Sequence, residues 1–358
     1  MTALLAGSMP FPAQRSMGAV CVGTSIYLFA GVGKQGSESI LDVSSDLWRF
    51  DTDLLAWQEI PATGSWPSPR RCAGMCAVGS RILVWGGSGV RADADGVKIH
   101  SFLDDMWSFD TVDGTWTCEQ DQTHGDDPAS ARPSPRYFPV FKPTLEGQML
   151  FGGYTEDCLG HRNLRDTWVL TGRHWTRLDD GSDVGGPLGA PVARYGAMSA
   201  SVGADVYLFG GHGQGRDLAD LWMFDGTTRT WELVDPGTQE SSPSPRYAGA
   251  FGAYGSRLFL FGGRSRLRPK VNHDDLWSFD LQRGSWELIE SSPGGGSGPG
   301  PTRPGYHAKP AYCTQDRYLW MHGGEGTAGH VSDFWRLDMG RARWDLVQNP
   351  RDDDPAFW

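Results

Sequence analysis

Histidine and carboxylate side chains gather in two short stretches of the chain, and both stretches could carry acid–base or metal chemistry. The first reads GGYTEDCLGH and contains Glu156 and His161. The second reads HGGEGTAGH and contains Glu325 and His330. Imidazole changes its charge near neutral pH and often binds metals, and a carboxylate can act beside it as an acid or a base. These four side chains are therefore candidate catalytic residues.

The elements that position these candidates belong to a repeat that occurs six times. Each copy has an apolar run ending in a Gly pair, a polar loop, an Asp-x-Trp step and a closing Trp. The second Gly of the pair falls at Gly31, Gly87, Gly153, Gly211, Gly263 and Gly324. The closing Trp falls at Trp57, Trp116, Trp175, Trp231, Trp286 and Trp344. Such a repeat predicts one closed body of similar units rather than several domains.

The Gly pair, the Asp-x-Trp step and the closing Trp resemble the kelch repeat, and the resemblance runs from about Arg15 to Val347. It implies an all-β, six-bladed kelch-type β-propeller with four antiparallel strands per blade. We expect a single propeller domain over residues 1–358, with blades at about 15–60, 69–119, 135–178, 193–234, 245–289 and 304–347. Kelch propellers serve enzymes and protein-binding adaptors alike, so the resemblance does not choose a function.

Each copy begins with a strand rich in small residues, such as GAVCVG in the first copy and YGAMSASVG in the fourth. Strands nearest a propeller axis converge and leave room for small side chains, so these runs are expected to be the innermost strands. The twelve Trp at repeat positions are expected to pack between blades rather than to form a ligand cage.

The loop that enters the first strand of a blade and the loop that leaves its second strand must lie on the same face of the disc. The loops that follow the Gly pairs hold five of the nine His: His100, His161, His212, His273 and His330. Histidine gathered on one face suits proton transfer or metal ligation. Polar loops also attract His without any such role, and both interpretations stay open.

One set of these side chains predicts a metal site. Glu156, His161 and His212 come from the neighbouring third and fourth copies, and two His with one carboxylate can bind iron or zinc and leave positions open for substrate. We therefore predict Fe(II) or zinc at this set, with His212 as a further candidate catalytic residue. Among kelch proteins, the iron-dependent plant specifier proteins carry Glu, Asp and His at four-residue intervals in one loop, and no loop here has that pattern.

A second constellation is basic and stands where the first strand of each blade begins. Its members are Arg15, Arg70 or Arg71, Arg136, Arg194 and Arg246, with His307 near the corresponding place in the sixth copy. In one interpretation these Arg bond loop carbonyls or a nearby carboxylate. In the other they face the channel and bind an acidic substrate through bidentate contacts. On the second interpretation, Arg15, Arg71, Arg136, Arg194, Arg246 and His307 are candidate substrate-binding residues.

Composition limits the remaining possibilities. The net charge of −11 and the pI near 5.2 argue against a general electrostatic affinity for nucleic acid or for an anionic membrane. The chain shows neither a secretory signal nor an 18-residue apolar segment, so we expect a soluble, cytoplasmic protein. Its six Cys show neither Cys-x-x-Cys spacing nor a dense framework, and we expect reduced thiols. The motifs of common hydrolases, kinases and dehydrogenases are absent from the sequence.

Two functions follow from these observations. The first is a small-molecule enzyme of the lyase, isomerase or cyclase type, which acts on a polar or anionic substrate at the loop-side mouth of the channel. The second is a non-catalytic kelch interaction module that binds a protein partner on the same face.

Overall fold

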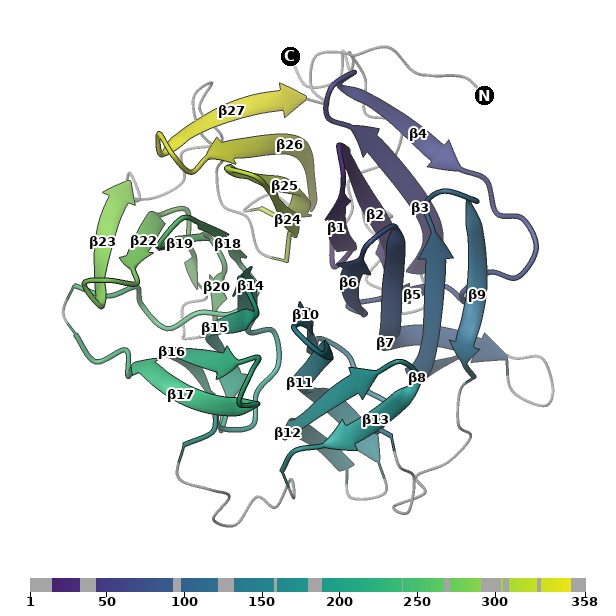
Figure 1. The fold of residues 1–358 in the computed structure, drawn as a ribbon, viewed down its shortest axis with the longest axis horizontal. Helices are drawn as coiled ribbons and strands as arrows, with labels where there is room; N and C mark the ends of the chain where they lie inside the picture. Colours follow the sequence, from purple (N-terminus) through teal and green to yellow (C-terminus); the bar gives the residue numbers. More distant parts are fainter. Residues whose placement is uncertain are drawn as a thin grey trace.

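The computed structural model describes residues 15–32, 43–92, 98–121, 132–157, 160–179, 189–239, 241–266, 271–290, 304, 309–326 and 330–348. Six antiparallel sheets, each with a core of four strands, stand around a central axis (Figure 1). The predicted six-bladed, all-β kelch-type propeller is confirmed. Among the described residues, no helix has the length and apolar character needed to span a membrane.

The first three blades follow the chain in order. Blade 1 contains β1 (Gly18–Val22), β2 (Ser25–Val32), β3 (Val43–Asp51) and β4 (Ala56–Ile60). Blade 2 contains β6 (Gly74–Val78), β7 (Arg81–Ala92), β8 (Lys98–Asp110) and β9 (Thr115–Gln120), and the two-residue strand β5 (Arg70–Arg71) extends its inner edge. Blade 3 contains β10 (Val140–Thr144), β11 (Gly147–Asp157), β12 (Gly160–Thr171) and β13 (His174–Arg177).

The last three blades repeat the pattern. Blade 4 contains β14 (Met198–Val202), β15 (Asp205–Gly213), β16 (Arg216–Asp225) and β17 (Thr230–Asp235). Blade 5 contains β18 (Ala250–Tyr254), β19 (Arg257–Phe261), β22 (Leu276–Asp280) and β23 (Ser285–Glu290), with the short pair β20 (Arg264–Ser265) and β21 (Val271–Asn272). Blade 6 contains β24 (Ala311–Gln315), β25 (Tyr318–Glu325), β26 (His330–Asp338) and β27 (Arg343–Gln348). In each blade the first of the four core strands lies nearest the axis, as predicted, although β10 (VFKPT) has larger side chains than the other five (Figure 1).

The closing Trp of each blade packs on the preceding blade, as the sequence predicts. Its indole ring contacts the residue that stands just before the Gly pair or its equivalent in that blade. The ring centroids are 5.1 Å apart for Trp116–Phe29, 5.9 Å for Trp175–Trp85, 4.9 Å for Trp231–Phe151, 5.2 Å for Trp286–Phe209, 4.7 Å for Trp344–Phe261 and 6.0 Å for Trp57–His322. His322 therefore serves in the core as the sixth aromatic ring, and it is 1% exposed.

Six backbone hydrogen bonds join the blades in a closed ring around the axis. One residue of each blade donates its N–H to the carbonyl of the matching residue in the preceding blade. The donor–acceptor distances are 3.1 Å for Ser16 to Lys309, 2.9 Å for Cys72 to Ser16, 2.8 Å for Phe138 to Cys72, 3.4 Å for Gly196 to Phe138, 2.8 Å for Ala248 to Gly196 and 2.7 Å for Lys309 to Ala248. We call these six residues the axial ring.

All residues of the axial ring adopt a left-handed backbone conformation. Their φ angles lie between 52° at Cys72 and 63° at Gly196. Gly196 is the only glycine among the six, and the other five pay a local conformational cost of about 1 kcal/mol each. Such a conformation persists where the surrounding structure enforces it, and here the interblade hydrogen bonds do so.

Among the described residues, blades 6 and 1 share no strand where the propeller closes, and residues 1–14 and 349–358 lie outside the described part of the chain. Trp57 of β4 donates a hydrogen bond to Gln348 of β27, and both side chains are buried. A disulfide joins Cys21 of β1 to Cys313 of β24. The expectation of reduced thiols is therefore wrong for this pair, whose residues lie far apart in the sequence but side by side in the closed ring. Cys72, Cys76 and Cys118 are free thiols.

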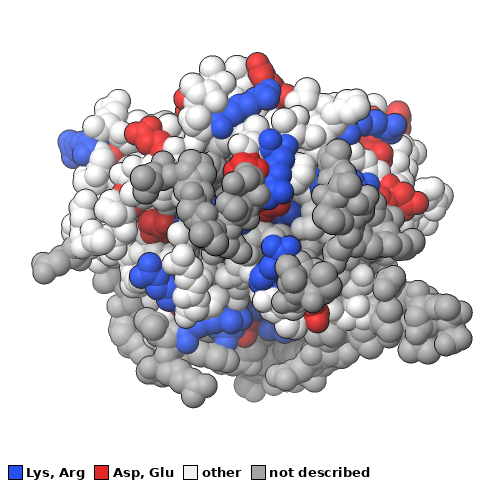
Figure 2. Space-filling view, turned by 90° about the horizontal axis from the view of Figure 1, so that it is seen from below, with Lys and Arg blue, Asp and Glu red and all other residues white. Residues whose placement is uncertain are grey.

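Charged residues of both signs are interspersed on the outside of the disc. Figure 2 shows Lys and Arg next to Asp and Glu on one side of the molecule. On the outer strands, Arg173 bonds Glu119 at 2.6 Å and Arg257 bonds Glu287 at 3.0 Å. Exposed pairs of this kind contribute little to stability.

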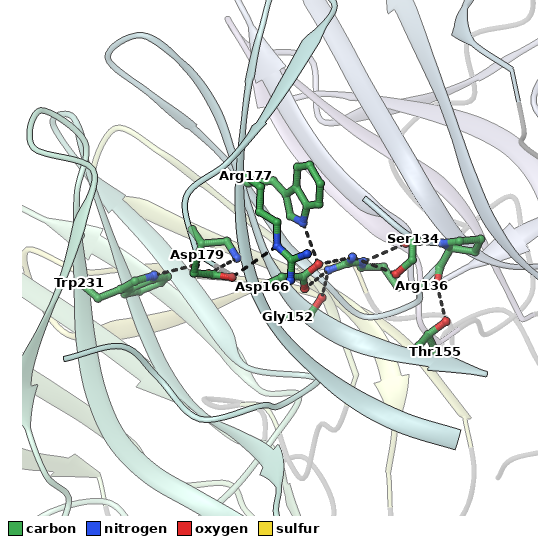
Figure 3. Close-up of polar contacts among 11 residues, drawn as sticks. Ser134, Arg136, Gly152, Thr155, Asp166, Arg177, Asp179 and Trp231 are labelled. Atoms are coloured by element: carbon green, nitrogen blue, oxygen red, sulfur yellow. Dashed lines mark hydrogen bonds and ion pairs between the residues drawn. The ribbon is translucent and has the colours of Figure 1, made fainter. Parts of the chain in front are cut away.

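The repeat Arg and the repeat Asp form a buried ion pair inside each of four blades. In blade 3, both terminal nitrogens of Arg136 donate to Asp166, at 2.5 and 2.7 Å, and Nη1 also donates to the carbonyl of Gly152 at 3.1 Å (Figure 3). Trp168 donates its indole N–H to the same carboxylate at 2.7 Å. Burial alone would raise the pKa of Asp166, but Arg136 holds that pKa below its ordinary value.

The same unit recurs as Arg70–Asp105, Arg194–Asp220 and Arg246–Asp275. The four arginine side chains are at most 1% exposed. Their donors are occupied by carboxylates and by loop carbonyls, so Arg136, Arg194 and Arg246 do not line a substrate site. The structure thus supports the first interpretation of the arginine set, and in blade 2 the repeat position belongs to Arg70 rather than to Arg71.

Arg70 and Arg71 offer a matched test of this assignment. Replacing Arg70 by Met leaves the buried Asp105 carboxylate without its cation, so we expect the free energy of unfolding to fall by about 3–5 kcal/mol. Arg71→Met removes a side chain that meets no carboxylate among the described residues, and we expect a loss below about 0.5 kcal/mol. Denaturant unfolding of both variants measures the difference. Equal losses would contradict the assignment.

The disulfide gives a second test, because it closes a loop that spans nearly the whole chain. We expect Cys313→Ser to lower the free energy of unfolding by about 2–4 kcal/mol. A reducing agent should destabilise the native protein by a similar amount and should leave the variant unchanged. Cys118→Ser, at a free thiol, is the control. Titration of six free thiols in the denatured, unreduced protein would refute the disulfide.

Candidate functional site

One face of the disc is built directly on the axial ring. The residue before each ring residue pairs with the residue that follows the Gly pair of the same blade. These backbone pairs are Arg15 with Val32, Arg71 with Ser88, Tyr137 with Tyr154, Tyr195 with His212 and Tyr247 with Arg264. We call the surface formed by these pairs and by the loops beside them the ring face. It contains the candidate residues that the sequence placed after the Gly pairs.

Blades 2 to 5 contribute a continuous row of aromatic rings to the ring face. Successive ring centroids are 5.4 Å apart for Phe102–Tyr137, 5.4 Å for Tyr137–Tyr154, 5.5 Å for Tyr154–Tyr195 and 6.0 Å for Tyr195–Tyr247. We call this row the aromatic shelf. The guanidinium of the exposed Arg266 lies over Tyr195 and Tyr247, 5.7 and 5.8 Å from their centroids. Burial raises the pKa of Tyr195 to about 12, so its hydroxyl stays protonated at neutral pH.

Blades 5, 6 and 1 contribute a cluster of cations around one carboxylate. Glu325 is 3.0 Å from Arg15, 3.1 Å from Arg264 and 3.5 Å from Lys309. Burial alone would raise the pKa of Glu325, but the three cations hold it below its ordinary value. The four side chains are between 15% and 21% exposed, so the group carries a net charge of +2 that solvent reaches. We call it the cationic cluster.

Arg71 stands in blade 2, between blade 1 and the end of the aromatic shelf. Its Nε lies 3.5 Å from the hydroxyl of Ser88, and no carboxylate among the described residues pairs with it. Arg71 occupies the position that Tyr137, Tyr195 and Tyr247 hold in the next three blades. Its guanidinium is thus available to a ligand, in contrast to that of Arg70.

His212 is fixed by a buried carboxylate. Its Nδ1 lies 2.7 Å from Oδ1 of Asp217, whose side chain is 1% exposed. The other oxygen of Asp217 accepts hydrogen bonds from the hydroxyl of Ser265 at 2.9 Å and from the backbone N–H of Arg266 at 2.6 Å. This arrangement assigns the Nδ1 proton to the bond with Asp217 and leaves Nε2 as the nitrogen that can accept a proton.

The predicted metal set is not assembled. Glu156 and His161 face each other in the β11–β12 hairpin, 3.4 Å apart and about half exposed, and His161 stacks on Tyr154. His212 instead turns to Asp217, its partner in the β15–β16 register. In the part of the chain that the structure describes, no three His, Cys, Asp or Glu side chains are arranged to hold a metal ion. These residues do not fit the predicted Fe(II) or zinc.

The remaining candidates are also separated. Glu325 opposes His330 in the β25–β26 hairpin, but its oxygens bond the cationic cluster. Burial lowers the pKa of both His330 and His100. The five His of the exit loops thus stand on five different blades, and the structure shows no group in which they act together. His307 lies outside the described residues.

Several residues of the ring face were not identified from the sequence. The aromatic shelf, Arg264, Arg266 and Asp217 are absent from the predicted site. The sequence did contain a signal for part of the shelf. The residue after the repeat Arg is Arg or Tyr in four blades, and the repeat itself does not require a large side chain there. Lys309 carries no such signal, because the six axial-ring positions differ in residue type, and Phe102 carries none because it lies in a loop that the repeat does not specify.

The half-buried His273 makes the fold sensitive to acid. Burial, with a smaller effect from Arg246, lowers the pKa of His273 to about 4. The unfolded chain therefore takes up this proton first, near pH 6.5, and stability falls as the pH drops from about 6.5 towards 4. By pH 5 the expected loss is about 2 kcal/mol. His273→Gln should remove this part of the acid sensitivity, which denaturant unfolding at pH 7 and pH 5 measures. Identical pH dependence in the two proteins would contradict the assignment.

Comparison with known proteins places this architecture in a family. The model of the KLHDC2/KLHL20/DRC7 Kelch-repeats domain matches residues 3–138 and 149–357. The chain is 27% identical to the leucine-zipper-like transcriptional regulator 1 homolog of Drosophila melanogaster, over 77% of this chain and 26% of that protein. It is 24% identical to the human Kelch domain-containing protein 3, over 70% of this chain and 63% of that protein.

One relative has the name of an enzyme. The chain is 26% identical to N-(sulfonatooxy)prop-2-enimidothioate sulfolyase of Thlaspi arvense, over 80% of this chain and 82% of that protein. By contrast, the chain spans only 26% and 18% of the length of the regulator homolog and of the host cell factor of Drosophila melanogaster. The family match covers most of the chain, and the chain belongs to the kelch-repeat family.

Proposed function

We propose that the ring face is a binding site for a segment of a partner protein. The observation that carries the proposal is the position of the aromatic shelf next to Arg71 and the cationic cluster, on one face and around one axis. Aromatic side chains and arginine are enriched in the well-packed centres of protein interfaces. The relatives named as a transcriptional regulator homolog and as a host cell factor do not have the names of enzymes, which supports an interaction module.

The two halves of the ring face favour a partner segment of mixed character. Tyr137, Tyr154 and Phe102 are only partly buried, so their rings offer apolar area, and the two Tyr also offer hydroxyl groups. On the other side, the net positive charge of the cationic cluster attracts an acidic side chain of the segment. Because the protein as a whole is acidic, this local charge also orients the segment during the encounter.

A small-molecule enzyme is the second candidate, and the His212–Asp217 pair favours it. A buried carboxylate that fixes one imidazole nitrogen leaves the other able to act as a general base. Tyr195 and Tyr247 lie 5.5 and 6.0 Å from the His212 ring, centroid to centroid, and supply hydroxyl donors nearby. The relative with the name of a sulfolyase is consistent with this candidate. The described residues contain no metal group beside the pair.

Charge reversal on the ring face tests the proposed function. We expect Arg71→Glu and Arg266→Glu to weaken the binding of a copurifying partner at least about tenfold, because each variant places a negative charge on the binding face. Arg283→Glu is the matched control, since Arg283 is 77% exposed in an outer turn. Copurification identifies the partner, and titration with the purified partner gives the Kd.

The result separates the two candidate functions. Equal Kd values for native protein and both ring-face variants would contradict partner binding at this face. For the enzyme candidate, His212→Gln should abolish turnover of a small molecule while it preserves the Kd for the partner. Loss of partner binding alone, with no His212-dependent turnover, would leave the interaction module as the function.

A further inference from the structure

Below the axial ring lies a cavity of about 120 Å³. It extends from the ring residues to Lys142 of β10 and Tyr312 of β24, between the innermost strands. A single water needs only about 10–15 Å³ of such space, so the cavity can hold several waters or a small solute. The aromatic shelf and Arg71 are not part of its wall, but Lys309 of the cationic cluster is, so the cavity borders the proposed partner site at that residue.

Lys142 crosses the cavity. It follows the ring residue Phe138 by four positions in blade 3, and its Nζ lies over the ring of Tyr312, 5.9 Å from the centroid. Tyr312 belongs to blade 6, which stands opposite blade 3 across the axis (Figure 1). No carboxylate among the described residues pairs with Lys142, and burial lowers its pKa.

Tyr312 adds a hydrogen-bond donor at the same end of the cavity. Its oxygen accepts the backbone N–H of Ser199 from blade 4, at 3.2 Å. Burial raises the pKa of Tyr312, so the hydroxyl keeps its proton and can donate it to a ligand. Lys142 and Tyr312 therefore bring an ammonium group, which lies over the face of the tyrosine ring, and a hydroxyl group to one cavity.

The wall of the cavity contains two cations and no Asp or Glu. The second cation, Lys309, belongs to the axial ring and shares Glu325 with two arginines. The protein as a whole has a net charge of −11, so a cavity lined only by positive charge is a local exception. Lys142 is partly buried. An ammonium group that is removed from water without a counter-charge is costly, and the cost is relieved by loss of the proton or by binding of an anion.

We propose that the axial cavity binds one small inorganic anion, held by the ammonium of Lys142 and the hydroxyl of Tyr312. The anion is of the class of chloride or a tetrahedral oxyanion such as phosphate. It supplies the counter-charge that the described protein residues lack and fills the space between blades 3 and 6. Its binding couples opposite blades, because its two ligands come from opposite sides of the axis.

Thermal unfolding at constant ionic strength tests the proposal. Gluconate, which is larger than either candidate anion, is replaced stepwise by chloride in one series and by phosphate in another. We expect the Tm of the native protein to rise with the anion that binds, and calorimetric titration with that anion to saturate at one site. The more effective series identifies the anion as chloride or as the oxyanion.

Two variants and a control assign the effect to the cavity. Lys142→Met keeps the length of the side chain without its charge and should weaken anion binding at least about thirtyfold. Tyr312→Phe removes only one oxygen and should weaken it about fivefold, which keeps the test valid if Lys142→Met does not fold. Arg283→Met, at the exposed outer turn, should bind as the native protein does.

The proposal fails if neither anion gives saturable binding to the native protein, as expected if Lys142 is instead a neutral amine. It also fails if Lys142→Met or Tyr312→Phe binds the anion as tightly as the native protein. Partner binding at the ring face does not enter these measurements.

Discussion

The structure depends on the axial ring, in which each blade donates one backbone hydrogen bond to the blade before it. The ring fixes six residues in a left-handed conformation and so sets the direction in which their neighbours point. The residue on one side of each ring position contributes to the ring face, and the residues on the other side line the axial cavity. Both proposed ligand sites are consequences of this one arrangement.

The repeat uses its most regular residues for stability. Arg, Asp and Trp form a buried unit within a blade, and the closing Trp packs against the preceding sheet. Because the polar groups of these side chains bond one another, they are not free to bind a ligand. Ligand binding therefore depends on positions that the repeat does not constrain. Blades 3, 4 and 5 place Tyr next to the ring, whereas blades 1 and 2 place Arg there, and this difference divides the ring face into its aromatic and cationic halves.

The fold could be predicted from the sequence because its determinants are local and repeated six times. The Gly pairs, the Trp spacing and the small residues of the inner strands each specify one step of the same blade. The disulfide between Cys21 and Cys313 could not be predicted, since only closure of the ring brings these residues together. The same closure turns His322 into a core aromatic residue that contacts Trp57.

For the candidate site, the sequence predicted the face of the disc but not the contacts between its side chains. Loop position correctly indicates that His161, His212, Glu325 and Arg71 belong to one surface, but it does not give the direction of a side chain. His212 turns to Asp217 because the two are paired across a hairpin, and Glu325 turns to cations from three blades. For this reason the predicted metal ligands Glu156, His161 and His212 are not brought together. The sequence also does not distinguish the adjacent Arg70 and Arg71. Arg70 is buried and bonds Asp105, whereas Arg71 lies on the ring face.

Native-state hydrogen exchange at the six axial-ring amides tests this account most directly. If the closed ring holds the propeller together, all six amides should exchange slowly, with protection close to that of global unfolding. Gly196, whose hydrogen bond is the longest at 3.4 Å, should be the least protected of them. Fast exchange at several ring positions, in a protein whose blade strands remain protected, would show that the blades are held by side-chain packing alone and would contradict the account.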